Sequence, residues 1–127
     1  MNTPTSAVLI PAAAYRPIEI ITINDLNEGL DFLVGGVADV ILPALLHQLW
    51  WVNEDRNSLG LARNDRATHL ARRHRLRGVS DYSTGGHIAG DMVVTGGSDR
   101  TGEPLSLPET QAIRLIRNLD SYYPAPV

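Results

Sequence analysis

The order of apolar segments along this chain constrains its fold more than any other feature of the sequence. Short runs rich in isoleucine and valine, bounded by turn residues, indicate β-strands, whereas apolar residues spaced three or four apart indicate amphipathic helices. Strands are expected at 7–11, 16–23, 37–42, 46–52 and 92–95, and helices at 25–34, 64–77 and 106–119. The resulting order, β-β-α-β-β-α-β-α, predicts an α+β fold with about three helices and a small sheet that is mixed or mainly antiparallel.

The three expected helices carry recognisable N-terminal signals. Asn24 and Asn64 are placed to cap the first and second helices, because an asparagine oxygen accepts a free N–H of the first turn. Ser106 and Glu109 form the capping-box pattern at the third helix. An added short strand at 59–61 is a further option.

The chain has the length of one domain and carries no feature that divides it. Its 127 residues can bury a core without covalent staples, and the absence of cysteine excludes disulfides and thiolate metal sites. We expect a flexible N-terminus at 1–6, a single domain at 7–120 and a proline-rich tail at 121–127. No apolar run approaches the roughly 20 residues of a membrane span, and the N-terminus lacks a basic signal region. We therefore expect a cytoplasmic protein without membrane contact.

Missing motifs exclude several classes of enzyme. The chain has eleven basic residues, all arginine, so it cannot form a Walker phosphate loop, which needs a lysine. It contains no GxGxxG, GxSxG or HExxH pattern. We expect no catalytic residue, no cofactor and no metal. A small enzyme that uses the carboxylates of Asp39, Glu54 or Asp91 is the least favoured hypothesis.

Positive charge is concentrated in one segment of the chain. Between Arg56 and Arg77 there are seven arginines and a single acid, whereas the rest of the chain holds four arginines and thirteen acids. A GC-rich genome explains arginine in place of lysine, but it does not explain this clustering. Guanidinium groups form forked hydrogen bonds with phosphates and carboxylates. The basic helix therefore indicates an acidic partner protein, an anionic ligand or a solvated face that complements the chain's own acids.

The candidate binding residues lie around a turn and the helix start that follows it. A helix N-terminus presents backbone N–H groups that favour anions. One tryptophan is added because adjacent strand residues face opposite sides, so either Trp50 or Trp51 can remain on the surface. The complete set of candidate residues is Trp51, Asn53, Glu54, Asn64, Arg66, Arg72, Arg73 and Arg77.

Four segments together resemble a known family over about residues 7–118. They are LIPA, LVGGVADVILP, WWVNEDRNSLGLARNDRAT and IAGDMVVTGG. These segments are similar to the small phage and mobile-element proteins gathered as domain of unknown function 3846. The most specific matches fall at Gly35, Gly36, Asp39, Asn53, Glu54, Asn64, Arg66 and Ala67. Gly90 and Asp91 match a later Gly-Asp of the pattern. Asp39 stands where the family pattern more often has glutamate, and the stretch at 72–87 is longer and more basic than the pattern.

The family has no activity that could be assigned to this chain. The resemblance therefore implies only a biological setting, that of phages and plasmids. Short accessory proteins of phages and plasmids often interfere with host enzymes or defence systems. We therefore expect a non-enzymatic counter-defence or host-takeover factor that binds a host protein or sequesters an anionic, nucleotide-like signal. The alternative is a nucleic-acid-binding accessory protein that uses the arginine-rich helix, although the sequence pI of about 5.7 disfavours it. Formation of a homo-oligomer is left open.

Overall fold

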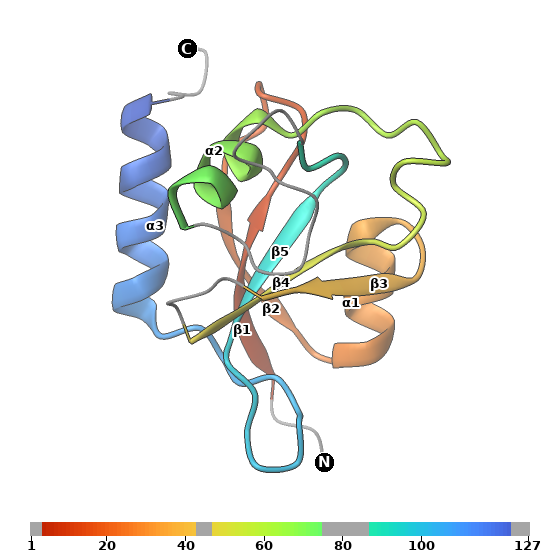
Figure 1. Cartoon of the computed structure of the whole chain (residues 1–127). Helices are drawn as coiled ribbons and strands as arrows, with labels where there is room; N and C mark the ends of the chain where they lie inside the picture. Colours follow the sequence, from red (N-terminus) through yellow and green to blue (C-terminus); the bar gives the residue numbers. More distant parts are fainter. Residues whose placement is uncertain (1–3, 43–46, 75–86, 123–127) are drawn as a thin grey trace.

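The computed structural model describes residues 4–42, 47–74 and 87–122 (Figure 1). Within these residues the chain follows the expected α+β order. The elements are β1 (Thr5–Ile10), β2 (Glu19–Ile23), α1 (Leu26–Val34), β3 (Ala38–Ile41), β4 (Gln48–Asn53), α2 (Asp65–His74), β5 (Met92–Gly96) and α3 (Glu109–Tyr122). The expected end of the second helix at Arg77 lies outside the described residues. None of the helices in the described segments is long and apolar enough to cross a membrane.

The strands form one sheet in the order β2-β1-β5-β4-β3. Val8 of β1 pairs with Ile20 of β2 on one side and with Val94 of β5 on the other. β5 comes late in the sequence but lies at the centre of the sheet, between β1 and β4. Every strand pair among the described residues is antiparallel, which decides between the mixed and antiparallel sheets that the sequence left open.

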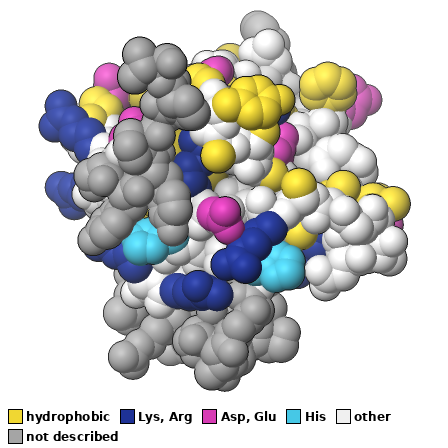
Figure 2. Space-filling model, turned by 90° about the horizontal axis from the view of Figure 1, so that it is seen from above, with side chains coloured by type: hydrophobic (Ala, Val, Ile, Leu, Met, Phe, Trp, Pro, Cys, Tyr) yellow, Lys and Arg dark blue, Asp and Glu magenta, His cyan; other side chains and the backbone are white. Residues whose placement is uncertain are grey.

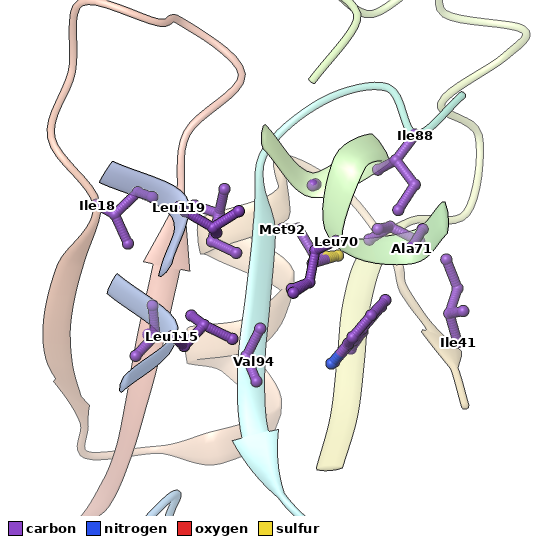
Figure 3. Close-up of a cluster of buried hydrophobic side chains, with 14 of the residues drawn as sticks. Ile18, Ile41, Leu70, Ala71, Ile88, Met92, Val94, Leu115 and Leu119 are labelled. Atoms are coloured by element: carbon purple, nitrogen blue, oxygen red, sulfur yellow. The ribbon is translucent and has the colours of Figure 1, made fainter. Parts of the chain in front are cut away.

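Helices cover both faces of the sheet (Figure 1). On one face, Leu115 and Leu119 of α3 and Leu70 of α2 lie over Met92 and Val94 of β5 (Figure 3). On the opposite face, a smaller cluster beneath α1 is formed by Ala7, Leu9, Ile23, Leu30, Val34 and Val93. β1 and β5 contribute to both clusters because successive strand residues face opposite sides of the sheet.

The starts of α1 and α2 test the predicted capping residues. Asn64 caps α2 as expected, since its Oδ1 accepts an N–H of the first turn at 3.0 Å. The expected cap at Asn24 is wrong, because β2 continues through Ile23 and the chain needs one more residue to turn into the helix. Asp25 is the cap of α1 instead, and its carboxylate accepts an N–H of the first turn at 3.2 Å.

Two other local expectations are also corrected. Ser106 does not cap α3, because its hydroxyl accepts the N–H of Ser6 at 2.9 Å and the helix begins three residues later. The added strand at 59–61 is not formed. That stretch belongs to a turn in which the N–H of Leu59 donates to the carbonyl of Asp55 at 2.9 Å. At Ser106 a distant contact replaces the local pattern, whereas at 59–61 a local turn forms in place of the strand.

Gly96 lies where β5 passes close to the segment that leads into α3. A Cβ at this position would overlap the carbonyl oxygen of Ser106. Since backbone atoms cannot move aside as a flexible side chain can, Gly96→Ala should lower the free energy of unfolding by about 1–3 kcal/mol. Gly97→Ala is the matched control, because its Cβ would meet nothing closer than 3.4 Å. Urea denaturation measures both variants, and equal stability would contradict this packing.

Candidate binding surfaces

Asn53 lies at the end of β4 and is almost fully buried. Its Nδ2 donates to the carbonyl of Val34 at 3.1 Å, and its Oδ1 accepts the N–H of Asp55 at 2.8 Å. A Cβ on Gly36 would lie 2.8 Å from Nδ2, so the glycine leaves the room that this contact needs. Asn53 therefore joins the end of α1 to the end of β4, while the neighbouring Glu54 is exposed.

Asn64 joins three segments of the chain. While its oxygen caps α2, its Nδ2 donates to the carbonyl of Ile10 at 2.8 Å and to that of Gly90 at 3.0 Å. Ile10 ends β1, and Gly90 lies just before β5. One buried amide thus holds two central strands beneath the start of a helix, and both of its N–H donors are used.

Arg66 is only 2% exposed and holds the connection between β1 and β2. Its Nη2 donates to the carbonyls of Pro11 at 2.8 Å and Ala13 at 3.1 Å. Its Nη1 is buried without a hydrogen-bond partner among the described residues. Burial lowers the pKa of Arg66, because the charged guanidinium is removed from water, and the carboxylates of Asp120 and Asp91 oppose this shift.

The structure does not bring the expected polar residues into one binding site. Asn53 contacts the end of α1 on one face of the sheet, whereas Asn64 and Arg66 belong to the start of α2 on the other. All three side chains are buried and bond to the chain's own backbone, since buried polar groups must be paired. This corrects the expected cluster. Glu54 is exposed, and its backbone N–H donates to the carbonyl of Val37 at 2.8 Å.

The arginine-rich segment is partly paired with acids. Arg72 and Arg73 are exposed on α2, and Arg77 lies outside the described residues. Within this segment, Arg56 pairs with Asp39 at 4.0 Å and Arg63 pairs with Asp65 at 2.6 Å; outside it, Arg16 pairs with Asp91 at 3.6 Å. Figure 2, which shows the end of the molecule where α2 lies, has arginine side chains beside acidic and histidine side chains. Binding of phosphates by Arg72 and Arg73 stays a prediction.

The two tryptophans lie on opposite faces of the sheet, as strand alternation predicts. Trp50 is fully buried in the core beneath α2 and α3. Trp51 is half-buried beside α1, and its indole N–H donates to the Thr95 hydroxyl at 3.0 Å. Trp51 also lines a cavity of about 390 Å³ between α1 and residues 102–104. Among the predicted binding residues, Trp51 is thus one whose side chain is partly exposed to solvent and borders a cavity.

Two of the three carboxylates that a small enzyme would use accept hydrogen bonds from the chain's own backbone. Asp39 Oδ1 accepts the N–H of Val40 at 3.0 Å, and Asp91 Oδ1 accepts the N–H of Ala12 at 2.8 Å. β4 separates the strand of Asp39 from the strand that follows Asp91. Among the described residues, no group of three histidine or carboxylate side chains is placed to hold a metal ion.

A groove that the sequence did not predict lies between β2 and α1. We call it the β2–α1 groove; it has a volume of about 630 Å³ and is lined by Ile21, Thr22, Ile23, Asn24, Asp25, Glu28, Gly29, Phe32 and Leu33. Phe32 is 85% exposed. The apolar side of α1 carries Leu26, Leu30, Leu33 and Val34, and Phe32 falls outside this stripe. An aromatic residue outside the buried stripe of a helix was the sequence signal that could have indicated this groove.

Gly29 brings α1 close to β2 at the bottom of this groove. A Cβ on Gly29 would overlap the side chain of Ile23. The rim is acidic, because Asp25 and Glu28 line it. No arginine or histidine stands among the described residues of the lining. The surface therefore combines an apolar floor with negative charge.

Comparisons with known proteins inform the fold and leave the activity open. Neither a protein-family model nor a curated protein matches the sequence. A solved structure that is similar is that of the small RNA methyltransferase HEN1, with a TM-score of 0.54 and 14% identity. The similarity covers 91% of this chain and 16% of that one, so this chain spans a small part of the longer protein. At this identity the similarity shows the fold alone.

The bridging role of Asn64 can be tested by removing its amide. Asn64→Ala should lower the free energy of unfolding by about 2–4 kcal/mol, because α2 loses its cap and two buried carbonyls lose their donors. Asn57→Ala is the control, since Asn57 is exposed on a turn. Urea denaturation followed by circular dichroism measures both variants. A loss no greater than that of Asn57→Ala would contradict the role assigned to Asn64.

Proposed function

We propose that this protein is a small non-enzymatic binding protein that docks a partner protein in the β2–α1 groove. The observation that carries the proposal is Phe32, whose side chain is 85% exposed beside a cleft with an apolar floor. Aromatic side chains are enriched in protein interfaces, and a contiguous exposed apolar surface marks an interaction site. A partner that covers Phe32 and fills the groove would remove this surface from water.

The geometry favours a partner protein over an anionic small molecule. Such a ligand would need accessible donors from Asn53 and Arg66 in one pocket, yet both side chains are buried against the backbone. The exposed Arg72 and Arg73 can contribute contacts with an acidic surface of the partner. Pairing of neighbouring arginines with acids weighs against a nucleic-acid-binding role, which needs a continuous basic surface.

The resemblance to phage and mobile-element proteins supplies the setting for this proposal. Accessory proteins of that kind often act by binding host enzymes or defence proteins, and a partner-binding groove suits such a role. We therefore propose a host protein as the partner, counter-defence or host takeover as the role and the host cytoplasm as the place of action.

Phe32→Ser should weaken binding of groove ligands at least about tenfold, which corresponds to about 1.4 kcal/mol of lost apolar contact. Peptides that bind the wild-type protein are first selected from a displayed library of random short sequences. Their affinities for the wild type and the variant are then measured by fluorescence anisotropy. Circular dichroism checks that Phe32→Ser is folded, which we expect because the residue is exposed.

Leu59→Ser is the matched control. Leu59 is also an exposed apolar residue, at 59%, but it does not line the groove. This variant should bind the selected peptides as the wild type does. A library that yields no binder, or peptides that bind Phe32→Ser as tightly as the wild type, would overturn the proposed function.

A further inference from the structure

The two edges of the sheet differ in how their backbone N–H groups are used. An exposed edge strand offers unpaired N–H and C=O groups to another strand. On β3, Asp31 Oδ1 accepts the N–H of Ala38 at 2.9 Å, and Asp39 Oδ1 accepts the N–H of Val40 at 3.0 Å. Ala38 and Val40 are alternate residues, so both N–H groups point away from β4. Carboxylates therefore close the β3 edge to a further strand.

Among the described residues, nothing pairs with the outer edge of β2. β2 pairs with β1 over Glu19–Ile23, and none of the described side chains forms a hydrogen bond with the backbone of these residues. Alternate residues of an antiparallel edge strand direct their N–H and C=O groups outward. Ile20 is 47% exposed, and Thr22 is exposed as well. β2 thus offers unused backbone groups along the β2–α1 groove.

The groove lies on the α1 side of this edge. Its floor includes Ile21 and Ile23 of β2, while Phe32 and Leu33 contribute from α1. A strand added beside β2 would place every second side chain on that side, above the groove. Strand addition takes its affinity from main-chain hydrogen bonds and its specificity from pockets for alternate side chains. The open edge of β2 supplies the main-chain hydrogen bonds, and the β2–α1 groove supplies the pocket for alternate side chains.

Acidic side chains stand at both ends of the open edge. Glu19 begins β2, whereas Asp25 and Glu28 border the groove beyond the end of the strand, and all three are exposed. A second copy of this chain that added its own β2 here would bring the same three acids against them. A partner segment with lysine or arginine at its ends would instead form opposite-charge pairs. Charge complementarity therefore selects a basic partner segment.

We infer that the β2 edge accepts an extended segment of a partner protein as an additional strand. The segment carries apolar residues at alternate positions, which enter the groove, and lysine or arginine at its ends, which pair with Glu19, Asp25 and Glu28. This inference rests on the proposed function and names the chemistry of its partner.

Backbone methylation of a selected peptide tests the strand pairing. Each amide nitrogen of a peptide from the displayed library is methylated in turn, which removes one N–H donor. Binding should fall at least about tenfold at every second position and change little between them, because only alternate N–H groups face β2. Hydrogen exchange followed by NMR should show new protection at alternate residues of Glu19–Ile23 when the unmodified peptide binds.

Neutral variants of the rim test the charge preference. Asp25→Asn with Glu28→Gln keeps the helix cap, since asparagine also caps helices. These changes should reduce the affinity for peptides with basic ends by about two- to tenfold, as expected for two exposed ion pairs. Peptides with neutral ends should bind as before. Asp55→Asn with Glu109→Gln is the control, because it makes the same change in net charge at exposed acids outside the groove.

The outcomes separate this inference from the proposed function. If peptides bind Phe32→Ser more weakly but methylation of their backbone has no alternating effect, the proposed function is supported and the strand pairing is overturned. Selected peptides without basic ends would overturn the charge preference. Sedimentation that detects dimers of the wild-type chain, dispersed by an added groove peptide, would show a second copy as the occupant and overturn the partner segment.

Discussion

The buried amide of Asn64 is the contact on which the arrangement of the central strands depends. It begins α2 and donates to carbonyls that lie 54 and 26 positions away along the chain, at the end of β1 and just before β5. Arg66, in the first turn of the same helix, adds donors to the connection that follows β1. Because buried polar groups cost free energy unless they are paired, a misplaced strand would leave several of them unsatisfied at once.

This arrangement leaves the sheet with two unequal edges. β3 is covered by the carboxylates of Asp31 and Asp39, which accept its outward N–H groups. β2 lacks such carboxylates among the described residues and borders an apolar groove with an acidic rim. Edge strands are normally protected because they invite association. The unprotected edge next to the exposed Phe32 is therefore the place where we propose that a partner binds.

The features that depend on local sequence signals could be predicted. Strand and helix order followed from apolar periodicity, and Asn64 was assigned as a helix cap because a cap depends on the next few residues. The prediction that Ser106 caps α3 was wrong, because its hydroxyl accepts a hydrogen bond from Ser6 at the far end of the chain. A second prediction grouped Asn53 with Arg66, since both lie in one polar stretch of sequence. The sheet separates these two side chains, which no local pattern reveals.

The sequence by itself determined the α+β order of the elements, the cap of α2 and the opposite faces of Trp50 and Trp51, because periodicity and capping act over a few residues. Tertiary structure alone decided that β5 enters between β1 and β4, and that this leaves β2 at an edge. It also decided which polar residues are buried and where a groove opens. These features arise from the contacts of segments distant in sequence, and the balance of burial and hydrogen bonding across the whole chain selects them.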